Sequence, residues 1–140
     1  MVYEMIDGYL LMSREVKHKE FLSLTGCRIT GEDIENIVIS ALEGGIGHWA
    51  ILNNSTPVWS NKPKGLSTSE YATQLLIEGH ALKFIDTEDE IAFWELNLLK
   101  LIKGCIHFFA ANPDFDFEDV DAAVADEIFQ YALFNEITFS

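Results

Sequence analysis

The chain is poor in basic residues, with 9 Lys and Arg against 23 Asp and Glu in 140 residues, a formal net charge of -14. This deficit disfavours direct binding of nucleic acid and contact with anionic membranes. The sequence also lacks an apolar run near the ~20 residues of a membrane span. Its start carries Glu4 and Asp7 where a secretory signal has basic residues. We therefore expect an intracellular protein with no membrane contact.

Signatures of chemistry are also missing. The two cysteines, Cys27 and Cys105, are far apart without metal-type spacing, which predicts two buried thiols. The four histidines are scattered, and no pair has the spacing of a helical zinc site. The glycine-rich turn at 44–47 has neither a dinucleotide nor a P-loop pattern, and no nucleophile elbow or Cys-His motif is present. We expect no enzyme activity, no cofactor and no metal.

What the sequence does contain is a core. Hydrophobic residues make up 49% of the chain, which excludes a disordered acidic tail. We expect an N-terminal extension over 1–19 and one domain over 20–140, with a loop at 53–64 inside it. The hydrophobic periodicity predicts the following elements in chain order. They are a strand at 20–29, a helix from Thr30 to Leu42, a short apolar run at 48–52, a helix at 68–77, a hairpin of 81–85 with 91–96, and a helix from Leu98 to Ala111.

Local signals mark the ends of these helices. Thr30 and Asp33 form a capping-box pattern, Asn97 is a second N-cap candidate, and Gly44 fits a left-handed position at a helix end.

A last helix over 117–134 has a wide apolar arc, which needs either two layers of the same fold or a homodimer through this helix. A closing strand at 136–139 follows. The order of elements predicts an α+β fold, with a mostly antiparallel sheet of about four to five strands and about four helices; α/β remains the lesser alternative.

The acidic residues gather in two places. From residue 112 to 140 there are eight acids and no Lys or Arg. The candidate partner-binding residues in this segment are Asp114, Asp116, Glu118, Asp119, Asp121 and Asp126. A second candidate cluster on the expected hairpin turn comprises Asp86, Glu88, Asp89 and Glu90. The first cluster resembles the start of a calcium loop, but Asp119 and Ala125 stand where that loop needs Gly and Glu.

Two segments carry a resemblance to a known group. The segment Ala41-Leu42-Glu43-Gly44-Gly45-Ile46-Gly47-His48-Trp49-Ala50 resembles an Ala-Leu-Glu-Gly-Gly-Ile-x-Tyr-Trp signature of small uncharacterised proteins encoded by bacteriophages and prophages. The segment Gln130-Tyr131-Ala132-Leu133-Phe134-Asn135-Glu136-Ile137 is similar to their closing Gln-Tyr-Ala-Leu-Phe-Gly-Glu-Ile segment. His48 and Asn135 depart from the pattern. The resemblance implies a phage setting in a bacterial cytoplasm, where small accessory proteins often disarm host defences.

Three functions are compatible with these observations. Duplex DNA carries one charge per roughly 1.7 Å, so a domain roughly 35 to 40 Å across matches a length of DNA with about 20 charges. We therefore expect an anti-CRISPR or anti-restriction inhibitor whose acidic, nucleic-acid-mimicking surface binds a basic host protein or nucleoprotein complex. One alternative is a module that binds a signalling nucleotide near 44–49, although arginines for phosphate are scarce. The other is an accessory protein whose acidity only keeps it soluble.

Overall fold

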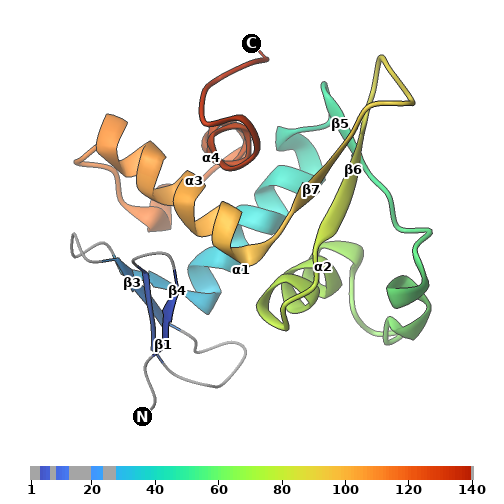
Figure 1. Cartoon of the computed structure of the whole chain (residues 1–140), viewed down its shortest axis with the longest axis horizontal. Coiled ribbons are helices and arrows are strands. Elements are labelled where there is room, and N and C mark those ends of the chain that lie inside the picture. Colours follow the sequence, from blue (N-terminus) through green and yellow to red (C-terminus); the bar gives the residue numbers. More distant parts are fainter. Residues whose placement is uncertain (1–3, 7–8, 13–19, 24–27, 140) are drawn as a thin grey trace.

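The fold is α+β, with four α-helices and two antiparallel sheets in the part of the chain that the structure describes. The computed structural model describes residues 4–6, 9–12, 20–23 and 28–139 (Figure 1). Strands β1 (Glu4–Ile6), β2 (Tyr9–Met12), β3 (Glu20–Ser23) and β4 (Arg28–Thr30) form one sheet in chain order. Strands β5 (Ala50–Leu52), β6 (Leu82–Asp86) and β7 (Phe93–Leu96) form the other. The predicted α+β class is confirmed, but the strands divide between two sheets.

The N-terminal strands differ from the sequence prediction. The expected single strand at 20–29 is wrong, because β3 and β4 pair antiparallel with Phe21 opposite Ile29, so the chain reverses between them. The range 1–19, expected as an extension, contains β1 and β2, and β2 pairs with β3. Cys27 lies outside the described residues. Cys105 is buried, as expected.

Helix α1 (Gly31–Ser40) begins where the capping-box pattern predicts. The Thr30 hydroxyl accepts from the Asp33 amide at 3.1 Å, and the Asp33 carboxylate accepts from the Thr30 amide at 3.0 Å. The helix continues into a π-helical turn, η2 (Ala41–Gly45), instead of ending at a left-handed Gly44. That prediction is wrong, since the φ of Gly44 is 171°, which is extended backbone open to any residue.

Helices α2 (Thr68–Ile77) and α3 (Leu98–Ala111) match the sequence prediction. Asn97 caps α3 by accepting from the Lys100 amide at 2.8 Å, and the β6–β7 hairpin that precedes α3 forms as expected. The last helix, α4 (Ala122–Phe134), starts five residues later than predicted. Its start is set by Asp121, whose carboxylate accepts from the Val124 amide, while 117–119 form a separate 3-10 turn, η4 (Phe117–Asp119).

Residues 136–139 do not form the predicted closing strand, because their backbone pairs with a side chain instead of a neighbouring strand. Asn135 ends α4 with a φ of 61° and turns the chain, as its left-handed tendency allows. We call residues 136–139 the C-terminal tail. The tail folds back along α4.

The core lies between the helices and the inner face of β5–β6–β7. In Figure 1, α3 and α4 lie side by side on one side of α1, and the sheet with α2 lies on the other. The wide apolar arc of α4 is covered within the chain by α3, η2, α1 and β7. Among the described residues, no helix is long and apolar enough to cross a membrane.

Candidate functional site

The end of the β6–β7 hairpin is an acidic turn with a fixed backbone. The Asp86 carboxylate accepts from the Glu88 amide at 2.8 Å, and the Asp89 carboxylate accepts from the Ile91 amide at 3.1 Å. The Thr87 amide also donates to the carbonyl of Trp49 at 3.2 Å, which ties the turn to the core. Glu88, Asp89 and Glu90 are exposed. Three of the four predicted acids therefore present free carboxylate surface at one projecting end of the molecule (Figure 1).

Exposed apolar side chains adjoin this acidic turn. Ile91 is 87% exposed, Phe93 is 64% exposed and Ile51 is 57% exposed. The register places Ile51 opposite Ile85, and Ile85 opposite Phe93. Ile51, Ile85 and Phe93 therefore form a row across the outer face of the sheet, and Ile91 lies beside that row in the turn. We call Glu88–Phe93 the hairpin end. The hairpin end combines charged and apolar surface. The sequence does not predict this combination, because it does not show which face of each strand is covered.

The acids of the first predicted cluster, from Asp114 to Asp121, occupy the connection between α3 and α4. Asp114, Asp116, Glu118, Asp119 and Asp121 are all exposed. None of them forms an ion pair with another described side chain. Two have local structural roles, since Asp116 accepts from the Glu118 amide and Asp121 caps α4. Phe115, which lies between Asp114 and Asp116, is half-buried and packs edge-on against Phe108.

The structure does not bring the two clusters together. The connection between α3 and α4 lies at one end of the long axis of the molecule, and the hairpin end lies toward the other (Figure 1). The hairpin acids and the Asp114–Asp121 acids therefore do not form one continuous strip of carboxylates.

Asp126 lies apart from both clusters, with its side chain only 16% exposed. Its Oδ1 accepts from the indole Nε1 of Trp49 at 2.6 Å and from Nε2 of Gln130 at 2.9 Å. Its Oδ2 lies 3.5 Å from Nε2 of His48. These contacts use the carboxylate inside the molecule, which makes Asp126 a structural residue in this fold.

Trp49 and Gln130 hold the C-terminal tail in place. Oε1 of Gln130 accepts from the amides of Thr138 and Phe139, both at 2.7 Å, and its Nε2 donates to the carbonyl of Phe139. The Phe139 ring then stacks on Trp49 with a centroid distance of 5.1 Å and an interplanar angle of 3°. Gln130 is the residue that sequence reasoning missed. The sequence offers one signal for it, a glutamine on a largely apolar helix. The structure shows that this side chain is only 1% exposed.

The two segments that carry the phage-protein resemblance meet in this cluster. Trp49 belongs to the first segment and Phe134 to the second, and their rings lie 5.6 Å apart. Trp94 of β7 contacts both rings. The residues that the resemblance singles out therefore build the core around the tail instead of an open site.

Exchanging Gln130 for glutamate tests this arrangement. Gln130→Glu removes the two hydrogen bonds that Nε2 donates, to Asp126 and to the Phe139 carbonyl. It also places a carboxylate beside that of Asp126, so we expect the free energy of unfolding to fall by about 2 kcal/mol. Gln74→Glu is the matched control, because Gln74 bonds only the exposed Glu78; we expect a change within about 0.5 kcal/mol. Urea denaturation of both variants measures the difference. Equal stability of the two would contradict the role given to Gln130.

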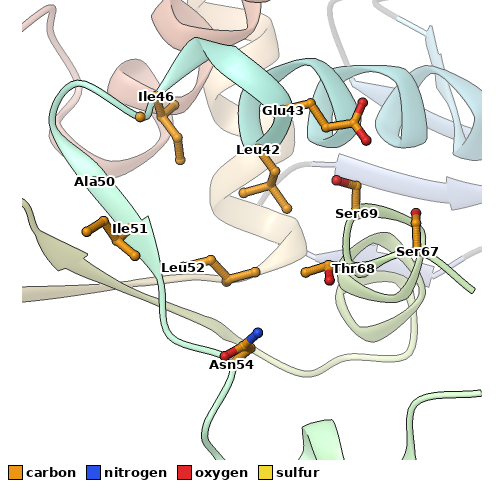
Figure 2. A pocket seen from close by; sticks show the side chains of 11 residues that line it. Leu42, Glu43, Ile46, Ala50, Ile51, Leu52, Asn54, Ser67, Thr68 and Ser69 are labelled. Atoms are coloured by element: carbon orange, nitrogen blue, oxygen red, sulfur yellow. The ribbon is translucent and has the colours of Figure 1, made fainter.

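A pocket of about 520 Å³ opens between the 42–54 segment and the start of α2 (Figure 2). It adjoins the glycine turn at 44–47, where a ligand pocket was one sequence-based alternative. The described residues that line it include no Lys, Arg or His, so it lacks the cations that a nucleotide phosphate needs. Among the described lining residues, Glu43 is the one with a formal charge.

No group of three or more His, Cys, Asp or Glu positioned to hold a metal ion occurs within the described part of the chain.

No protein-family model, curated protein or solved structure matches this chain.

Proposed function

We propose that this chain is a phage-encoded inhibitor of a bacterial defence complex, of the anti-CRISPR or anti-restriction kind, which acts by binding and not by catalysis. The hairpin end docks on a basic surface that otherwise holds nucleic acid. The supporting observation is that three exposed carboxylates and the exposed Ile91 and Phe93 occur together on one anchored turn. Protein interfaces typically combine an apolar or aromatic centre with a polar rim.

Charge supports the same proposal. A net charge of -14 attracts cationic surfaces and repels nucleic acid, and a basic groove concentrates this attraction. Carboxylates on the hairpin end take the place of phosphates there. The Asp114–Asp121 cluster lies too far away to share one small contact, so it strengthens the long-range attraction and orients the approach. The partner is thus a basic host protein or nucleoprotein complex in the bacterial cytoplasm.

Neutralising the hairpin end tests the proposal. The triple variant Glu88→Gln, Asp89→Asn, Glu90→Gln keeps the oxygen at position 89 that accepts from the Ile91 amide. Each exposed ion pair contributes about 0.2 to 1 kcal/mol, so we expect about tenfold weaker binding to the target. The measurement is competition with DNA for a purified CRISPR or restriction complex, at low and high salt, together with phage plating on bacteria that carry that system.

The matched control removes three exposed charges elsewhere, with Glu32→Gln, Glu78→Gln and Glu136→Gln. It changes the net charge equally and should bind almost as tightly as the unaltered protein. If both triple variants and a variant neutralised at Asp114, Asp116, Glu118 and Asp119 all inhibit like the unaltered protein, acidity serves only solubility. If neutralising Asp114, Asp116, Glu118 and Asp119 abolishes binding while the hairpin variant retains it, the contact lies at the other end of the molecule.

A further inference from the structure

The pocket beside α2 has two chemically different walls. Leu42, Ile46 and Leu52 supply an apolar wall from η2 to β5. Ser67, Thr68 and Ser69 line the other side from the start of α2, and the Ser69 hydroxyl is directed toward Leu42 (Figure 2). The Ser67 hydroxyl already accepts from the Glu70 amide. Small-molecule sites are typically concave and largely apolar, with a few placed polar groups that fix orientation. The volume and the lining therefore suit a small amphipathic molecule.

Ser69 is the polar group that points to a ligand. The residue is only 4% exposed, and its side chain lies on the side of α2 that faces Leu42 (Figure 2). Its hydroxyl has no hydrogen-bond partner within the described part of the chain. The neighbouring buried Thr73 differs, because its hydroxyl donates to the Ser69 carbonyl at 3.0 Å. No buried side-chain nitrogen or oxygen in the described part of the chain lacks a hydrogen-bond partner, so the unpaired Ser69 hydroxyl is reached by solvent at the pocket surface. A group that enters the pocket can therefore replace that solvent as its hydrogen-bond partner.

Glu43 sets the charge of that group. Its exposed carboxylate lies on the same side of the pocket as Ser69 (Figure 2) and forms no ion pair with any described residue. The described lining residues include no Lys, Arg or His. The full negative charge of Glu43 is larger than the partial positive charge of about half a unit at the N-terminus of α2, so the site favours a donor of positive charge. The overall charge of -14 acts in the same direction.

We propose that the pocket between η2–β5 and the start of α2 binds a small organic amine with an apolar body. The ammonium group donates to the Glu43 carboxylate and to the Ser69 hydroxyl. The apolar body lies against Leu42, Ile46 and Leu52. This site shares no residue with the hairpin end, Glu88–Phe93. Ile51 lies between the two, because it lines the pocket and also belongs to the apolar row beside the hairpin end.

Two probes with equal apolar bodies and opposite charge test the proposal. The ¹⁵N-labelled protein is titrated with 2-phenylethylammonium and, separately, with 3-phenylpropanoate, while amide chemical shifts are recorded. A molecule of this size binds in the millimolar range. We expect the ammonium compound to shift the amides of Leu42, Ile46, Leu52 and Ser69 in a saturable way, and the carboxylate compound to leave them unchanged.

Variants separate this site from general attraction of cations. Glu43→Gln should weaken binding of the ammonium probe by about tenfold, because it removes a charge-assisted hydrogen bond. Ser69→Ala should also weaken it. Glu32→Gln, which removes an exposed charge outside the pocket, should leave the affinity unchanged. The proposal is overturned by equal binding of both probes, by shifts confined to the acidic hairpin end, by no shift at all, or by an unaltered affinity of Glu43→Gln. None of these results bears on inhibition by the hairpin end.

Discussion

Replacing Trp49 with alanine is expected to lower the free energy of unfolding by about 3–5 kcal/mol, the usual cost of removing a large aromatic side chain from a core. The indole is 2% exposed and contacts the rings of Trp94, Phe134 and Phe139. Its Nε1 is also a donor to Asp126. The substitution therefore combines a cavity with a half-buried carboxylate that loses its shortest hydrogen bond. Urea or thermal denaturation followed by circular dichroism measures the change.

Two further substitutions divide this effect into its parts. Trp49→Phe keeps an aromatic ring but loses the donor, so it should give an intermediate loss. Trp59→Ala removes the same side chain from a half-buried position where it contacts the edge of Tyr71, and it should cost less. A Trp49→Ala loss no larger than that of Trp59→Ala would contradict the central position assigned to Trp49.

Gly104→Val is expected to destabilise the protein by about 3 kcal/mol, at the upper end of the usual range for overpacking. Gly104 lies in the contact between α3 and α4. A Cβ atom there would lie 2.5 Å from the Ile128 carbonyl oxygen and 2.8 Å from the Ala132 backbone nitrogen. Because backbone atoms cannot rotate away as a side chain can, the two helices must separate.

The control for this prediction is Gly65→Ala. Nothing lies within 4 Å of a Cβ at Gly65, so the substitution should be neutral or slightly stabilising through the unfolded state. Denaturation curves of both variants, measured in parallel, give the comparison. A Gly104→Val protein as stable as the unaltered one would show that α3 and α4 do not pack as closely as described.

The sequence predicts those elements whose ends carry local signals. Thr30 and Asn97 are side-chain caps whose hydrogen bonds depend only on residues three positions away, so α1 and α3 begin where predicted. The start of α4 is different. Its apolar pattern continues upstream through the 3-10 turn at 117–119, which hides the cap at Asp121. The C-terminal tail alternates like a strand, but its partner is the Gln130 side chain, and no local pattern reveals that.

The candidate sites show the same division. That Glu88, Asp89 and Glu90 lie on an exposed turn follows from the hairpin itself, and the structure agrees. Their separation from Asp114 and Asp116 depends on how far α3 carries the chain from the hairpin, which charge alone does not tell. The glycine turn at 44–47 indicates one wall of the pocket. The other wall, at Ser69, carries no sequence signal, because serine at a helix start is ordinary for capping and for solvent contact.

The carboxylate–amide hydrogen bonds within the β6–β7 turn and the bond from Thr87 to Trp49 have a kinetic consequence. In the proposed complex, the turn keeps nearly the shape that it has in the free protein, because these bonds already hold one conformation. It would therefore lose little conformational entropy on binding. Association is then limited by encounter and orientation, not by folding of the loop, and differences among partners appear chiefly as differences in residence time.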